Sequence, residues 1–177
     1  MDERFLLDTA LSILTSNGAE GDVFLESRRN LQFQIREGEV RDLSRADVRG
    51  MGVRAMREGR LGFVHTSALD PDGVRRAAER ALELSRSANP REDLHLPDPA
   101  GPGDGRDEGE GLGLHDPTIG TRSIREKQEW ARAAEAVARG YDARITRTEG
   151  ASYSETLTSA WISNTKGLHR HLRKSYL

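Results

Sequence analysis

The stretch that most constrains the fold is Arg49–Thr66, which reads RGMGVRAMREGRLGFVHT. Before the pair Glu58-Gly59, the apolar residues Met51, Val53 and Ala55 stand at alternate positions. After it, Leu61, Phe63 and His65 alternate in the same way and would lie on one side of a strand. Period-two alternation around a glycine-bearing pair is typical of a β-hairpin, because successive side chains of a strand point to opposite faces. The sequence therefore predicts two short strands joined by a tight turn.

The glycines within the two strands of this hairpin are Gly50, Gly52 and Gly62. A strand glycine loses conformational entropy on folding and has no side chain to pack, so it often marks a bulge or the close approach of another backbone. Two interpretations stay open: a half-buried structural hairpin, or a sheet surface shaped to receive another chain. On the second interpretation, the peptide- or partner-binding residues are Gly52, Arg54, Gly62 and Phe63.

Composition limits the partners and the chemistry of the chain. The 177 residues suffice for one sizeable core, and a net charge of −2 gives no concentrated basic face for a nucleic acid or a membrane surface. The absence of cysteine excludes disulfides, thiolate metal sites and a cysteine nucleophile. The acidic start MDERFLLDTALSIL lacks the basic region of a secretion signal, and no apolar run approaches the roughly 20 residues of a membrane span. We expect a soluble cytoplasmic protein.

Elsewhere in the first hundred residues, periodicity predicts a helix over Asp2–Asn17 and a second helix that begins at Asp70-Pro71-Asp72 and ends at Asn89-Pro90. Aspartate is a favoured N-cap, and proline suits the first helical position because its missing N–H would have no partner there. Short strands are predicted before the hairpin at 22–27, 30–36 and 39–44. The expected fold is therefore α+β: an antiparallel meander sheet of about five strands with two helices packed on it.

The composition changes after residue 100. Gly101–Gly113 alternates glycine with acidic residues and has no aromatic or β-branched side chain, which predicts a mobile linker; an acidic metal-binding loop is the alternative. Ser123 and Glu126 form a capping-box pattern that opens a third helix, and Gly140 is placed to end it. The apolar stripe expected to be buried on this helix consists of Trp130, Ala133, Ala134 and Val137.

Two further strands are expected at 143–149 and 154–163, followed by a turn at 164–167 and the start of a further sheet. The expected domains are an N-terminal α+β domain at 1–100, an acidic glycine-rich linker or loop at 101–120, and a helix with strands at 121–177. The last strand and turn have little sequence after them to supply a partner, so the chain is expected to stop inside a domain.

The residues alone predict no active site. None of the five histidines forms the helical pair with an intervening glutamate that a zinc hydrolase needs. His169 and His171 would share one face of a strand, but no third ligand accompanies them, which favours a solvated polar pair. The sequence also lacks a phosphate-binding glycine loop and a G-x-S-x-G nucleophile motif. We therefore expect no catalytic residue and no metal ligand within this chain.

The ordered motifs of the chain resemble the N-terminal part of the TldD/PmbA family, whose members are also called modulators of DNA gyrase. The resemblance covers nearly the whole chain outside the acidic glycine segment. The motifs that carry it are G-V-R at 52–54, G-R-x-G-F at 59–63, D-P at 70–71, Y-D-x-R-I at 141–145 and S-N-x-x-G-L at 163–168. The sequence of residues 140–154 resembles the PmbA type more than the metal-bearing type.

The resemblance implies one half of a two-subunit cytoplasmic metallopeptidase complex that processes or degrades unfolded peptides. It implies a homodimer, or a heterodimer with a TldD-type subunit, and an extended peptide as substrate. Zinc is expected only in the metal-bearing subunit, on an H-E-x-x-x-H motif that this chain does not contain. This chain would supply dimerisation and substrate enclosure. The alternatives are a non-enzymatic regulatory module of the gyrase-modulator type, or a scaffold whose sheet is covered by helices.

Overall fold

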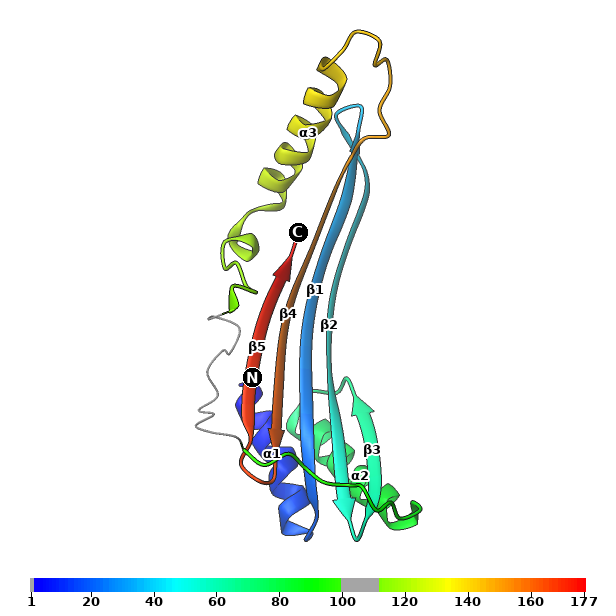
Figure 1. The fold of residues 1–177 in the computed structure, drawn as a ribbon, viewed down its shortest axis with the longest axis vertical. Coiled ribbons are helices and arrows are strands. Elements are labelled where there is room, and N and C mark those ends of the chain that lie inside the picture. The colour runs from blue at the N-terminus through cyan, green and yellow to red at the C-terminus, as the bar shows by residue number, and fades with distance from the viewer. Residues whose placement is uncertain (1, 100–111) are drawn as a thin grey trace. The chain divides into compact units, whose positions relative to one another are not determined.

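The computed structural model describes residues 2–99 and 112–177, and in this part of the chain it shows an α+β fold (Figure 1). The helices are α1 (Glu3–Ser16), α2 (Pro71–Ser87) and α3 (Ile124–Gly140), and the strands are β1 (Glu20–Arg36), β2 (Glu39–Arg57), β3 (Arg60–Thr66), β4 (Ala151–Asn164) and β5 (His169–Tyr176). The strands form one antiparallel sheet in the order β3-β2-β1-β4-β5. The predicted fold class, α+β with about five antiparallel strands, is confirmed.

The strands themselves are longer than predicted. The runs at 22–27 and 30–36 form the single strand β1, and the run at 39–44 continues into the hairpin as β2. Consecutive polar residues interrupt the apolar pattern of both strands. Arg28 and Arg29 of β1 are exposed, as are most residues of β2 between 39 and 50, and a strand exposed on both faces accepts such residues. Residues 20–66 therefore hold three strands, and β4 and β5 supply the other two.

The C-terminal part also differs from its prediction. Residues 143–149 form no strand, whereas β4 begins at Ala151 and pairs with β1 in the same sheet. The predicted turn at 164–167 is confirmed, with Gly167 at φ 92°. The segment beyond it forms β5 on β4, so β4 and β5 extend the first sheet and do not start another. Spacing in the sequence could not reveal that β4 finds its partner in β1, over a hundred residues earlier.

Local signals place the other turns and the helix ends as predicted. Both residues of Glu37-Gly38 and of Glu58-Gly59 have positive φ, 57° and 78° in the first pair and 52° and 70° in the second. Two-residue loops of this kind match the right-handed twist of the paired strands. Asp2, Asp70 and Ser123 cap α1, α2 and α3, and Ser123 forms the predicted capping box with Glu126.

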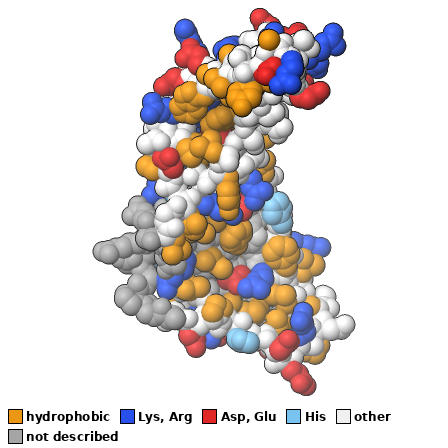
Figure 2. Space-filling view, turned by 45° about the horizontal axis from the view of Figure 1, so that its top comes forward, with side chains coloured by type: hydrophobic (Ala, Val, Ile, Leu, Met, Phe, Trp, Pro, Cys, Tyr) orange, Lys and Arg blue, Asp and Glu red, His pale blue; other side chains and the backbone are white. Residues whose placement is uncertain are grey.

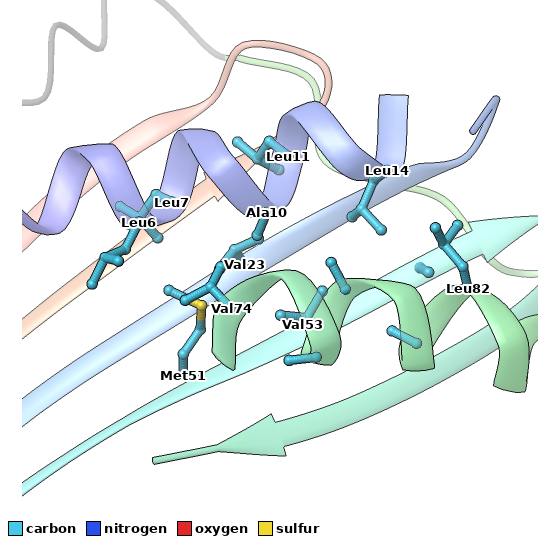
Figure 3. Close-up of a cluster of buried hydrophobic side chains, with 14 of the residues drawn as sticks. Leu6, Leu7, Ala10, Leu11, Leu14, Val23, Met51, Val53, Val74 and Leu82 are labelled. Atoms are coloured by element: carbon cyan, nitrogen blue, oxygen red, sulfur yellow. The ribbon is translucent and has the colours of Figure 1, made fainter. Parts of the chain in front are cut away.

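The chain divides into two compact units, each assembled from separate segments. The first comprises Met1–Ser27, Arg49–Gly111 and Ser159–Leu172. Its core lies between the sheet and the two helices α1 and α2, whose side chains point toward one another in Figure 3. Residues with no exposed surface come from each layer, among them Leu14, Val23, Val53 and Val74. Met51, Val53 and Ala55 of β2, which the hairpin alternation groups together, are buried in this unit, and Met56 beside them is buried as well.

The second unit comprises Arg28–Val48, Leu112–Thr158 and Arg173–Leu177. Leu31, Phe33 and Ile35 of β1 form its core with Ala131 of α3, and the ring of Phe33 stacks on Tyr153 with centroids 5.0 Å apart. The inward face of α3 is charged: Lys127, Ala131 and Glu135, one turn apart, are its buried residues.

The predicted apolar stripe of α3 is therefore wrong. Trp130 and Val137 expose 49% and 73% of their surfaces, and Ala133 and Ala134 are also exposed. The physical reason is that both buried charges are partnered by groups far away in the sequence. Lys127 pairs with Glu155, and Glu135 accepts hydrogen bonds from the turn between β1 and β2. Paired in this way, charged side chains can take the buried positions.

The acidic glycine segment lies mostly outside the described residues, so the predicted linker and its metal-binding alternative cannot be placed. Among residues 2–99 and 112–177, no helix is long and apolar enough to cross a membrane.

Candidate peptide- and partner-binding face

The hairpin of β2 and β3 brings three of the four candidate residues to one face of the sheet. In the antiparallel register Arg54 is opposite Phe63, and Gly52 is opposite His65. Paired residues share a face, and residues two apart on one strand share it too. Gly52, Arg54 and Phe63 therefore lie together on the face away from α1 and α2, which we call the open face. Gly62, one residue off this alternation, lies on the opposite face.

Gly62 is explained by the packing of α2 on the sheet. A Cβ atom at this position would lie 1.9 Å from the carbonyl oxygen of Ala81 and 2.6 Å from the backbone nitrogen of Ser85. Only a residue without a side chain lets the helix backbone come this close. The backbone that approaches this glycine belongs to the same chain.

The glycines of β2 on the open face have another cause. A Cβ atom at Gly52 would lie 3.1 Å from the ring of Phe63, and one at Gly50 would lie 2.7 Å from Nε2 of His65. The two rings of β3 thus lie over positions of β2 that have no side chain, an arrangement in which an aromatic ring shields a glycine of the neighbouring strand. Phe63 remains 55% exposed, so its ring is a flat apolar surface on the open face.

Arg54 is held on the open face by a buried carboxylate. Its Nε donates to Oδ1 of Asp22 at 2.7 Å, and its terminal nitrogen NH2 donates to Oδ2 of the same group. Asp22 is only 5% exposed, whereas Arg54 is about half exposed. The hydrogen bond from Asp22 raises the pKa of Arg54 above its ordinary value. A guanidinium has five N–H donors, so Arg54 keeps donors for a further acceptor on the solvent side.

Asp22 and Phe24 belong to this face but are not among the predicted site residues. Both lie on β1, two residues apart, and Phe24 is 43% exposed. The sequence does hold a signal for them, because residues two apart on a strand share a face. A buried aspartate in an otherwise apolar strand segment also needs a cation or hydrogen-bond donor as its partner. Identifying Arg54 as that partner needs the pairing of β1 with β2. In the space-filling view, hydrophobic side chains gather on the lower part of the visible face with single charged groups among them (Figure 2).

The open face borders a free edge of the sheet. The strand order puts β3 and β5 at the two edges. At β5, the backbone nitrogen of Ser175 donates to the carbonyl of Leu114 at 2.9 Å, so a further segment covers part of that edge. Among the described residues, no backbone hydrogen bond joins the outer edge of β3 to another segment. An exposed edge strand can pair with an extended chain through its unpaired N–H and C=O groups.

The histidines do not assemble a metal site. Nδ1 of His169 lies 2.8 Å from Oγ of Ser163, and the ring of His171 stacks on Trp161 with centroids 4.5 Å apart. Burial, helped by Arg4, lowers the pKa of His169. The two side chains therefore pack on β4 and are not the solvated pair expected from the sequence. In the part of the chain that the structure describes, no group of three potential ligands could hold a metal ion.

Two family models match the sequence. The PmbA/TldA metallopeptidase domain 1 matches residues 21–85, and the PmbA/TldA metallopeptidase central domain matches residues 117–177. Together these ranges cover well over half of the chain. A search of curated proteins found no match.

Solved structures share the fold. A suspected modulator of DNA gyrase from Bacteroides thetaiotaomicron is 24% identical, with a TM-score of 0.79 over 99% of this chain and 39% of its own. Another from Thermotoga maritima is 16% identical, with a TM-score of 0.78 over 98% of this chain and 38% of its own. TldE from Thermococcus kodakarensis is 18% identical, with a TM-score of 0.68 over 97% of this chain and 36% of its own. The chain spans less than two-fifths of the length of these proteins.

Proposed function

This chain belongs to the PmbA/TldD metallopeptidase family, and from that premise we propose that it serves a cytoplasmic complex that processes or degrades unfolded peptides. Its part is to enclose the substrate and to contact the partner subunit, which is a second copy or a TldD-type subunit. Zinc and the hydrolytic step belong to the metal-bearing subunit of the complex.

The observation that carries this proposal is the open face beside the free edge of β3. An extended peptide can add to the outer edge of β3 by main-chain hydrogen bonds, which do not depend on the peptide sequence. Phe63 and Phe24 offer apolar contacts, and Arg54, fixed by Asp22, offers donors to a peptide carbonyl or carboxylate. This combination suits substrates that are unfolded and varied in sequence.

The test is peptide binding, measured by the fluorescence anisotropy of a labelled unstructured peptide. We expect Phe63→Ser to weaken binding about tenfold or more, as removal of an aromatic anchor does in other interfaces. Phe5 on α1 is the matched control, because it is 53% exposed in the same unit but lies on a helix. Phe5→Ser should leave the affinity unchanged. Equal losses in both variants would contradict the assignment of the open face.

Capture of purified gyrase and amide exchange, measured beside peptide binding, separate this function from those of a gyrase-modulator module and of a scaffold. If the chain captures purified gyrase and binds no unstructured peptide, the regulatory function replaces the proposed one. If it binds neither, and the edge of β3 resists amide exchange with and without peptide, the scaffold function replaces it.

A further inference from the structure

A depression of about 210 Å³ lies in the second unit, where α3 begins. Its walls come from β1, β2 and β4 of the sheet and from the first turn of α3 with the residues before it. Among the residues that line it are Arg29, Arg45, Arg122, Ile124, Lys127 and Glu155. The depression is smaller than the roughly 300 Å³ at which pockets for drug-sized ligands start, so it suits a single chemical group.

The floor of the depression is a buried ion pair whose two charges cancel. Nζ of Lys127 lies 2.6 Å from Oε2 of Glu155 and donates to Oε1 at 2.9 Å, and both residues are at most 4% exposed. The hydroxyl of Tyr153 also donates to Oε2, at 2.7 Å. Burial, together with this carboxylate, raises the pKa of Tyr153, so the hydroxyl keeps its proton. The negative charge of Glu155 is thereby balanced by Lys127, which reduces its repulsion of an incoming anion.

Above this floor the guanidinium groups are in excess over carboxylates. Arg29 and Arg45 share one carboxylate, that of Asp47, each at 3.3 Å. Arg122 lies 3.4 Å from Glu126, whose carboxylate makes shorter bonds of 2.8 Å to Ser123. Each of the three arginines is about half exposed. Since a guanidinium carries five donors, all three retain several for a ligand.

We propose that this depression is an oxyanion site in which Arg29, Arg45 and Arg122 hold a carboxylate or phosphate group of a ligand. Guanidinium groups bind such anions through paired, charge-assisted hydrogen bonds. The carboxylates of Asp47 and Glu126 balance two of the three positive charges, and the bound anion balances the third. The Lys127–Glu155 pair forms the bottom of the site. The two possible sources of the group are a free inorganic anion and the terminal carboxylate of a peptide. The site stands independently of the function proposed above.

The test measures the melting temperature of the 177-residue chain with increasing phosphate or acetate, at constant ionic strength set with chloride. A ligand that binds only the native state raises the melting temperature in a saturable way. We expect saturation with at least one anion, and an affinity about tenfold weaker for each guanidinium removed in Arg45→Gln and Arg122→Gln. A peptide with a free carboxyl end, compared with its amide, shows whether the group comes from a peptide.

Arg125→Gln is the matched control. Arg125 stands in the same first turn of α3 but is 87% exposed and pairs with Glu129. Its removal takes away one positive charge at the same helix end, so unchanged affinity in this variant supports a defined site. No saturation with either anion overturns the proposal, as does an equal loss in Arg125→Gln, which would show diffuse charge attraction. Circular dichroism verifies folding, and Arg45→Gln alone serves if Arg122→Gln does not fold.

Discussion

At the scale of single residues, the two hairpin glycines named as candidates have different roles, and this gives the first prediction. A side chain at Gly62 meets the backbone of α2, which cannot move without loss of packing, so Gly62→Ala should lower the free energy of unfolding by about 3 kcal/mol or more. At Gly52 the neighbour is the ring of Phe63, which can rotate away, so Gly52→Ala should cost less than about 1 kcal/mol. Urea unfolding of both variants measures this, and equal losses would contradict it.

Glu135 gives a prediction about pH. Its carboxylate accepts hydrogen bonds from the backbone of Gly38 at 2.9 Å and of Glu37 at 2.7 Å, and these bonds lower its pKa from the ordinary 4.5. A carboxylate with a lowered pKa in the folded state stabilises the protein above the pKa of the unfolded state, and this contribution is lost as pH falls through the folded value.

We therefore expect the melting temperature of the wild type to exceed that of Glu135→Gln by a constant amount from pH 7 down to about pH 4.5. Below that pH the difference should shrink. Glu129→Gln is the control, because Glu129 is exposed on the same helix and its partner Arg125 lies mostly in solvent. A difference that stays constant down to pH 3 or below would contradict the role given to Glu135.

At the scale of elements, α3 depends on a buried ion pair, and the second unit should respond strongly to its disruption. Lys127→Met leaves the carboxylate of Glu155 buried without its cation, so we expect a loss of about 3–5 kcal/mol in the free energy of unfolding. Adding Glu155→Leu removes the uncompensated charge and should recover most of this loss. Denaturant unfolding of the single and double variants measures the coupling. A double variant as unstable as Lys127→Met would contradict it.

The same helix shows what the sequence could and could not predict. Its start at Ser123 and its end at Gly140 were predicted because a capping box and a terminal glycine are local signals. Its buried face was mispredicted because hydrophobic periodicity counts Lys127 and Glu135 as solvent-exposed. Their partners, Glu155 and the turn at Glu37-Gly38, are distant in the sequence. The candidate site follows this pattern: alternation groups Arg54 with Phe63, but only strand pairing adds Asp22.

At the scale of the whole molecule, the two units should differ in local stability. Among the described residues, sixteen buried hydrophobic residues form the core of the first unit, and four form that of the second. Buried apolar area sets most of the resistance to local opening. In native-state hydrogen exchange we expect the amides of β2 at Met51, Val53 and Ala55 to be better protected than those at 39–48. Uniform protection along β2 would contradict this.

A substitution in the smaller core extends this prediction. Phe33→Ala should lower local stability by about 3–5 kcal/mol, because it leaves a cavity beside Tyr153. Exchange should accelerate in the second unit, while the amides of Val53 and Ala55 in the first unit keep their protection.

Because β1 and β2 each run through both units, the residues that face the core can be followed along the whole of each strand. In β1 the buried hydrophobic side chains at 23, 25, 31, 33 and 35 keep a single alternation. In β2 the inward positions change from even to odd between Val40, which packs on the smaller core, and Met51 in the larger one. An alternation that slips by one residue requires one extra residue, as at a β-bulge. Deleting one residue there would remove this extra residue and give a single alternation from Val40 to Met51. Inserting one without a second bulge would turn Arg54 inward and Val53 outward, so this stretch is constrained in its length more than in its composition.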